Sequence, residues 1–263
     1  MKVQILVASH KQYKMPRNTK VYLPIFVGAA LVKEIPSGFH SDAVGDNISS
    51  ENSKFNELTA VYWAWKNSDA AVIGLDHYRR YFVSKKSVKK TFDNILNEKQ
   101  ILDLLKKGDI ILPCKRRYYI ETIESHYLHS HDEQGLLALK QTFSTFSETY
   151  NSALEKTLSS RSAHMFNMFI MKSDDFRQYS AWLFSTLRAI EKRIDYVHLK
   201  GNEKRVLGFI SEILMDVWVR ANHKKVVECP VQFMESNHWP KKIRIFLINK
   251  IKGGKSHLNT HIN

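Results

Sequence analysis

Residues 70–82, AAVIGLDHYRRYF, place several reactive side chains directly after a short apolar run. The apolar part, AVIGL, is too short for a core helix and rich in small and branched residues, so it predicts a buried strand. Ligands of open α/β sheets bind beyond the carboxyl ends of strands, where Asp76, His77, Arg79 and Arg80 would lie. These types suit a divalent metal and a diphosphate, because guanidinium forks pair with phosphate oxygens. An edge strand entering a solvated basic turn is the alternative.

A second segment repeats this pattern. Residues 109–120, DIILPCKRRYYI, again predict a short apolar strand, followed by Arg116, Arg117, Tyr118 and Tyr119. Two strand ends with the same basic and aromatic chemistry favour one shared anionic pocket.

Two further predicted strands carry polar residues of interest. Residues 2–9 lead into His10, where a mononucleotide-binding sheet would hold its base or ribose; a plain strand-to-loop transition explains it equally well. Asn167 interrupts the apolar run 164–172, and a buried amide must find hydrogen-bond partners. It could bind a sugar hydroxyl or a backbone group.

Helical spacing of apolar residues predicts the elements that must position these groups. The predicted helices cover residues 49–67, 97–107, 124–146, 174–192 and 205–220. Glu212 stands inside the last of them, where a carboxylate is costly unless it is paired or acts as a base. Glu57 lies off the apolar stripe of the first, and we interpret it as facing solvent rather than the ligand site.

Composition limits the remaining choices. The chain has 263 residues, a net charge of +14 and a pI near 9.6, which favours an anionic partner. Cys114 and Cys229 form no CxxC pair, so a cysteine-ligated zinc site is not expected and a reducing cytoplasm fits. No signal h-region or membrane-spanning run is found. Phosphate-binding GxxxxGK[ST] and GxGxxG loops, GxSxG and HExxH are absent.

The domain organisation predicted from these patterns is one domain, residues 1–240, followed by a tail, residues 241–263. The tail segment KKIRIFLINKIKGGK alternates cations with apolar residues. It suits either a basic amphipathic segment on anionic lipid or a last element covering the core edge.

Several sequence motifs stand out together by their order and spacing: SHKQYKMP, GDNIS, NELTAVYWAWKN, GLDHYRRYF, HMFNMFIMKSDDF, YSAWLF and RVLGFISEILMDVW. As a set they resemble a known bacterial family, a domain of unknown function found in capsular polysaccharide and O-antigen gene clusters. Some members of that family are described as glycosyltransferases, including galactofuranosyltransferases. The resemblance covers roughly residues 3–230.

The resemblance implies a sugar-nucleotide-dependent transferase with a single-domain GT-A-like α/β fold, a Rossmann-like mixed sheet flanked by helices. In such enzymes a strand commonly ends in an Asp-x-Asp motif that holds Mg²⁺ or Mn²⁺ on the donor diphosphate. Here Asp76 has no acidic partner at position 78, which leaves metal binding open. His77, Arg79 and Arg80 could neutralise the diphosphate without a metal.

The same resemblance suggests roles for single residues. Glu212 is our first choice for the base that deprotonates the acceptor hydroxyl, and Asp46 is the reserve. His10 and Asn47 are assigned to the nucleotide, and Asn167 to the donor sugar.

The expected donor is a nucleotide-diphosphate sugar, UDP-linked, of the galactose or galactofuranose class. The expected acceptor is a lipid-linked oligosaccharide of capsule, exopolysaccharide or O-antigen synthesis. Such an enzyme would be cytoplasmic and bound peripherally to the anionic inner face of the membrane, with no nucleic-acid partner. Two alternatives remain open: a basic nucleic-acid-binding protein, and a non-catalytic scaffold of polysaccharide assembly.

Overall fold

A mixed sheet organises residues 1–235, the part of the chain that the computed structural model describes. Its strand order is β10-β6-β9-β4-β1-β2-β3, and β9 alone in this order runs antiparallel to its neighbours. The strands are β1 (Val3–Ser9), β2 (Tyr22–Phe26), β3 (His40–Ser41), β4 (Val72–His77), β6 (Ile110–Pro113), β9 (Phe169–Lys172) and β10 (Val226–Cys229). The predicted α/β fold, a mixed sheet flanked by helices, is confirmed.

Four short strands lie off this order. Antiparallel pairing joins β5 (Arg80–Phe82) to β4 and to β11 (Val231–Phe233). A separate antiparallel pair joins β7 (Arg116–Arg117) to β8 (Ser162–Ala163).

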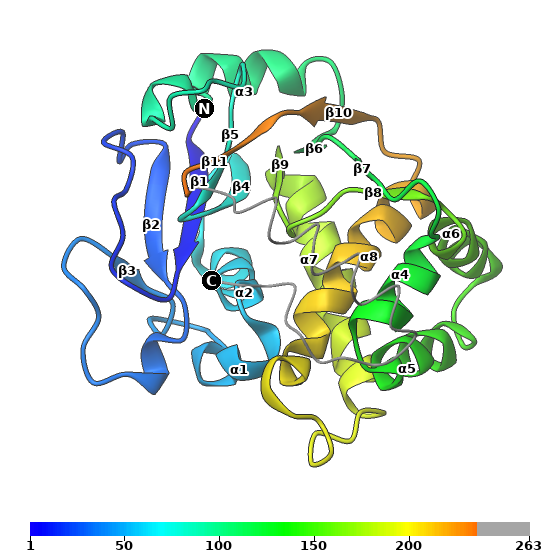
Figure 1. The fold of residues 1–263 in the computed structure, drawn as a ribbon. Helices are drawn as coiled ribbons and strands as arrows, with labels where there is room; N and C mark the ends of the chain where they lie inside the picture. Colours follow the sequence, from blue (N-terminus) through cyan, green and yellow to red (C-terminus); the bar gives the residue numbers. More distant parts are fainter. Residues whose placement is uncertain (236–263) are drawn as a thin grey trace.

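The sheet separates two cores because the side chains of β1 alternate. Val3, Ile5 and Val7 enter one core, whereas Leu6 and Ala8 enter the other. The first core is closed by α3, and the second, larger core by a group of longer helices. Figure 1 shows α4, α5 and α6 gathered on the side of the molecule opposite β1, β2 and β3. The helices are α1 (Asn52–Phe55), α2 (Leu58–Asn67), α3 (Glu98–Leu105), α4 (Ile123–Ser130), α5 (Glu133–Phe143), α6 (Glu148–Leu158), α7 (Ser173–Glu191) and α8 (Val206–Ala221).

Two of the predicted helices are interrupted. The first breaks into α1 and α2 at Asn56, which has a left-handed φ of 53° and whose Oδ1 accepts a 2.7 Å hydrogen bond from Nε of Arg205. The third breaks at Asp132, whose carboxylate caps α5 by accepting the backbone N–H of Gln134. The predictions for α3, α7 and α8 are confirmed to within two residues.

The tail predicted over residues 241–263 lies outside the described residues. Within residues 1–235, none of the helices combines the length and the apolar character that crossing a bilayer requires.

Candidate functional site

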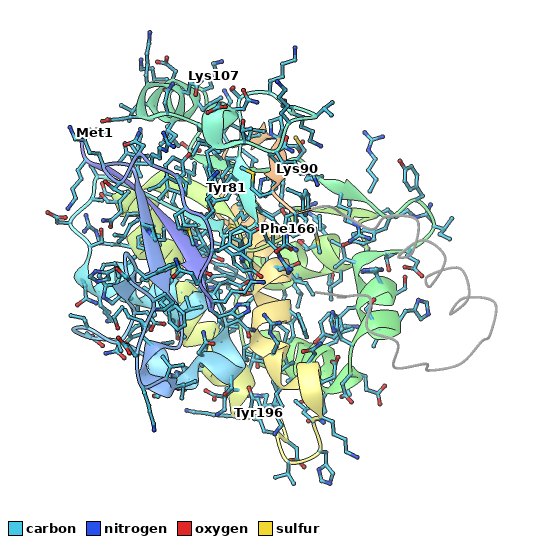
Figure 2. All side chains as sticks on the ribbon, turned by 60° about the vertical axis from the view of Figure 1, so that its left-hand side comes forward. Met1, Tyr81, Lys90, Lys107, Phe166 and Tyr196 are labelled. Carbon is cyan, nitrogen blue, oxygen red and sulfur yellow. The ribbon has the colours of Figure 1, made fainter. Side chains whose placement is uncertain are left out.

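The candidate site is a cluster of charged side chains at one edge of the sheet. His10 follows β1, His77 ends β4, and Asn167 precedes the antiparallel β9, so all three lie at the same edge. This is the carboxyl edge of the parallel strands, where α/β sheets bind ligands. Figure 2 shows the neighbouring Phe166 near the middle of the molecule.

Glu212 of α8 carries the most informative charge in this cluster. Its burial and the nearby Glu57 carboxylate raise its pKa to about 7, while Arg80, the Phe166 backbone and Arg116 act to lower it. A carboxylate that titrates near neutrality can accept a proton under ordinary conditions, which is the property of a general base. The expectation that Glu212 is a costly carboxylate inside an apolar helix agrees with this environment.

The turn before β9 is a rigid piece of the site. Phe166 and Asn167 both have left-handed φ angles, 81° and 54°. The buried Asn167 amide donates to Oε1 of Glu57 at 2.7 Å and to the Gly208 carbonyl at 3.1 Å, and it accepts from Oγ of Ser211 at 2.7 Å. We had assigned this amide to a donor sugar. In the structure it links the start of α2 to α8 through hydrogen bonds, and it holds the Glu57 carboxylate in position.

His77 faces the same turn. Its Nε2 lies 2.7 Å from the Phe166 carbonyl oxygen, which can only accept, so this nitrogen carries the proton. Burial lowers the pKa of His77 to about 4; Glu57 opposes this shift, and Arg80 and Arg79 add to it. The imidazole is therefore neutral near pH 7 and acts as a hydrogen-bonding group rather than as a cation.

Arg80 supplies the cation next to Glu212. Its guanidinium lies over the rings of Phe166 (4.4 Å to the centroid) and Phe233 (5.4 Å). Burial, with the neighbouring Arg79, lowers the pKa of Arg80, whereas Glu212 and Glu57 raise it. Within the described residues its buried Nε has no hydrogen-bond partner. A largely desolvated guanidinium with an unused donor is well prepared to bind an anion.

Arg79 extends the basic edge outward. Its guanidinium lies 3.7 Å from Oε2 of Glu235, and its backbone carbonyl accepts from the Met234 N–H at 2.9 Å. Partly exposed, it can reach a ligand that also meets Arg80.

An aromatic group flanks the arginines. Tyr78 packs edge-on against His10 (5.6 Å between centroids) and Tyr13 (4.9 Å), and the Lys11 ammonium lies 5.1 Å from the Tyr78 centroid. Partial burial lowers the pKa of His10, and Lys11, Arg205 and Arg79 lower it further. Of the three rings, His10 is exposed, Tyr13 is partly exposed and Tyr78 is buried. Aromatic rings beside cations are suited to a nucleotide, so the assignment of His10 stays a prediction.

The second basic segment also reaches the cluster. Arg116 of β7 is close enough to lower the pKa of Glu212, and its guanidinium lies 5.2 Å from the Tyr118 ring. Burial raises the pKa of Tyr118 to about 12, so its hydroxyl stays protonated; that hydroxyl lies 3.0 Å from Sδ of Met165. Both basic segments therefore act electrostatically on Glu212, although Arg116 itself is exposed; a shared pocket stays a prediction.

Two predicted site residues lie elsewhere. Asp46 sits in an exposed turn, where Tyr62 donates to its carboxylate at 3.3 Å and Asn67 donates to its carbonyl at 2.8 Å. The side chain of Asn47 hydrogen-bonds to backbone groups of residues 43–49. Both stabilise the turn before α1, and within residues 1–235 no hydrogen bond or ion pair joins them to Glu212.

Asp76 is the main correction to the predicted diphosphate and metal site. Strand alternation turns it to the opposite face of β4 from His77, where it is fully buried. Burial holds the pKa of Asp76 well above its usual range, among Tyr22, Tyr81 and Cys229. A carboxyl that is fully enclosed in the core does not fit a divalent cation, which also needs water or substrate oxygens as ligands. No three His, Cys, Asp or Glu side chains gather as a metal-binding group in residues 1–235.

The interpretation of Glu57 as a solvent-facing residue was wrong. Its carboxylate accepts from Asn167, and it raises the pKa of Glu212. The helical stripe could not reveal this, because the first turn of α2 is preceded by the left-handed Asn56. A polar residue next to a break in an apolar helix was the available signal.

Fold and site together define this protein as an α/β domain with an acid–arginine cluster at the carboxyl edge of its sheet. Residues 4–224 match the family model described as domain of unknown function DUF4422, and the chain belongs to that family. A solved structure, the apo form of the bifunctional glycosyltransferase WbbM, superposes with a TM-score of 0.80 at 27% sequence identity. The match covers 90% of this chain and 46% of that one, so this chain spans less than half of WbbM's length. No curated protein matches this chain.

The Asn167 network gives a first test of the site. Replacing Asn167 by alanine should destabilise the protein by about 3 kcal/mol, because the Glu57 carboxylate, the Gly208 carbonyl and the Ser211 hydroxyl each lose a partner. Urea unfolding measures the loss. Asn151→Ala, which removes one hydrogen bond to the Phe146 carbonyl, is the matched control and should cost about 1 kcal/mol. Equal losses in the two variants would contradict the network.

Proposed function

We propose that this protein is a glycosyltransferase that moves a hexose from a nucleotide-diphosphate sugar to an acceptor hydroxyl. The observation that carries the proposal is Glu212, a carboxylate with its pKa raised to about 7 beside the guanidiniums of Arg80 and Arg116. Glycosyl transfer requires a base for the acceptor hydroxyl and positive charge for the departing diphosphate, and this cluster contains both.

The donor side is built from the arginines and the aromatic group. Arg80 and Arg79 would bind the diphosphate, since a guanidinium fork matches two phosphate oxygens. The nucleoside would be contacted by His10, Tyr13 and Tyr78. His77 is neutral and would not bind the diphosphate as a cation; it would hold the Phe166 turn in place through its hydrogen bond. Asp76 takes no part in this assignment.

The reaction then needs few steps. The acceptor oxygen forms a bond to the anomeric carbon as the bond from that carbon to the diphosphate oxygen breaks. Glu212 takes the hydroxyl proton, and Arg80 stabilises the negative charge that develops on the leaving diphosphate. This arrangement corresponds to an inverting transfer. Tyr118 and Arg116 come from the second basic segment and interact electrostatically with Glu212, and we assign them to the acceptor position.

The finer assignment rests on resemblance. The similarity to WbbM, a bifunctional glycosyltransferase, supports transferase activity. The resemblance of the sequence motifs supports a GT-A-like enzyme of polysaccharide synthesis. We assign a UDP-linked hexose of the galactose or galactofuranose class as donor and a lipid-linked oligosaccharide as acceptor. The place of action would be the cytoplasmic face of the membrane, where such an acceptor is presented.

A screen of nucleotide sugars for thermal stabilisation tests this proposal, with and without Mn²⁺. We expect UDP-hexoses to raise the melting temperature with no Mn²⁺ requirement, because the arginine pair can neutralise the diphosphate. Stabilisation only in the presence of Mn²⁺ would indicate that donor binding requires a metal ion. Stabilisation by generic oligonucleotides and by none of the nucleotide sugars would replace the transferase by a nucleic-acid-binding function.

A further inference from the structure

Two exposed loops combine cations with apolar tips. Residues 85–90, KKSVKK, carry four lysines around Val88, which is 99% exposed. Residues 115–120, KRRYYI, carry three cations before Tyr119 and Ile120, which are 78% and 65% exposed. Neither segment contains a carboxylate. We call these two segments together the basic double loop.

The two loops lie side by side, although residues 91–114 separate them in the sequence. The Lys86 ammonium is near enough to Cys114 to oppose the effect of burial and of Glu228, which raise the pKa of that thiol. The backbone N–H of Cys114 donates to the Cys229 carbonyl at 3.1 Å, and that of Ser87 donates to Oε1 of Gln232 at 3.0 Å. The segment around β10 and β11 therefore anchors both loops.

The basic double loop borders the candidate site at two points. Lys90 donates to the Glu235 carbonyl at 2.5 Å, and the Glu235 side chain lies 3.7 Å from Arg79. Arg116 belongs to the second loop and acts on Glu212. A surface bound by this double loop would therefore lie next to the carboxylate that we assign to the acceptor.

Tyr119 shows how the apolar tip is displayed. Its φ of 56° is left-handed, a conformation that tyrosine seldom adopts, and its ring points into solvent rather than packing on the domain. The following Ile120 is exposed as well, although burying an aliphatic side chain would gain free energy. Exposed apolar residues rimmed by cations are typical of surfaces that enter a lipid headgroup layer.

We propose that the basic double loop docks this protein on a membrane rich in anionic phospholipid. The cations would lie among the phosphates, and Val88, Tyr119 and Ile120 would enter the interface between headgroups and acyl chains. Nucleic acid fits less well, because the aliphatic Val88 and Ile120 have no role in phosphate binding or base stacking. The docking itself is independent of the proposed transferase; only its purpose, meeting a lipid-linked acceptor, rests on that function.

Vesicle co-sedimentation of the full chain tests the charges. Lys86→Gln with Lys89→Gln should weaken partition onto phosphatidylglycerol vesicles about 25-fold, since each cation at an anionic surface contributes about a fivefold factor. The matched control, Lys192→Gln with Lys200→Gln, removes the same charge from the segment around Tyr196, which Figure 2 shows far from Lys90. It should partition nearly as the parent protein does, and raising the salt concentration should shrink the loop effect.

The apolar tips need a separate comparison. Val88→Ser and Ile120→Ser should each lower partition several-fold at any salt concentration, whereas Val197→Ser, which replaces a valine that is 87% exposed on the far segment, should not. Loop variants that partition like the parent protein would overturn the proposal. Binding of the same variants to oligothymidine tests a nucleic-acid surface instead. If the lysine variant lost oligothymidine binding but kept vesicle binding, the membrane proposal would also be overturned. UDP-hexose stabilisation of the same variants should be unchanged, which separates this result from failure of the transferase proposal.

Discussion

Glu212→Gln should lower the rate of glycosyl transfer by about 10³-fold while leaving donor affinity unchanged. The amide keeps the shape of the carboxyl group and cannot accept the hydroxyl proton, and general base catalysis typically contributes factors of about 10² to 10⁴. Turnover with a UDP-hexose and calorimetric titration of the same nucleotide sugar measure the two quantities. Glu155→Gln, on the exposed face of α6, is the matched control and should change neither.

The pH dependence gives this prediction a second readout. Because the pKa of Glu212 is raised to about 7, the active carboxylate forms as the pH rises through that value. The value of kcat/KM should therefore climb with pH up to about 7 and then level off. A flat profile between about pH 5 and about pH 8, or near-normal activity of Glu212→Gln, would exclude Glu212 as the base.

The same substitution should stabilise the fold at alkaline pH. A carboxyl whose pKa is raised on folding binds its proton more tightly in the folded state, so ionisation costs stability as the pH rises from the unfolded to the folded pKa. For Glu212 this range runs from 4.5 to about 7, which limits the cost to about 3 kcal/mol. Glu212→Gln should therefore unfold at higher urea concentration than the parent at about pH 8, with the difference vanishing below about pH 4.5. A destabilised variant at alkaline pH would contradict the buried environment.

Arg80→Ala should weaken binding of the UDP-hexose by about 100-fold. The guanidinium lies against the rings of Phe166 and Phe233, and its buried Nε is free of partners among the described residues. Charge-assisted hydrogen bonds to phosphate are the strong ones. Arg80→Lys keeps the charge and loses the planar fork, so it should recover only part of the affinity. Calorimetry with UDP and with the UDP-hexose measures both variants. Unchanged nucleotide affinity would remove Arg80 from the donor site.

Replacing Arg80 by alanine should also change the pKa of Glu212, which a loss of packing alone would not do. Arg80 lowers the pKa of Glu212, so its removal should move the rising limb of the kcat/KM profile to higher pH. Arg177→Ala, which removes a guanidinium 58% exposed on α7, is the control and should leave affinity and profile unchanged. Weak donor binding with an unshifted profile would indicate a role for Arg80 remote from Glu212.

The four neighbouring strands β6, β9, β4 and β1 were the most predictable part of the fold. β1, β4, β6 and β9 are short apolar runs that end in polar residues, and this local pattern survives in the tertiary structure because both faces of the sheet are buried. The breaks in the helices were harder to predict from the sequence. The break at Asn56 depends on a hydrogen bond from Arg205, 149 positions away, which no local window contains.

The candidate site was predicted in part. The basic ends of β4 and β6 and the carboxylate inside α8 stood out because charged residues follow or interrupt apolar runs. Glu57 did not, since its partner Asn167 is 110 positions away. Asp76 stood out for the wrong reason. It ends an apolar run, but in a strand every second side chain faces the other side, and Asp76 shares the face of Val72 rather than that of His77.

The sequence by itself determined which chemical groups are available: guanidiniums and imidazoles at the strand ends, and two carboxylates, Glu212 among them, in an apolar helix. Local patterns also determined the strands β1, β4, β6 and β9 and most helices, because burial imposes periods of two and of 3.6 residues on them. Only the tertiary structure decided which groups meet. It joined Glu212, Glu57, Arg80 and Arg116 from four separate elements and enclosed Asp76 beneath the sheet. The physical reason is that a pKa depends on burial and on neighbouring charges, and both arise only when distant segments pack together.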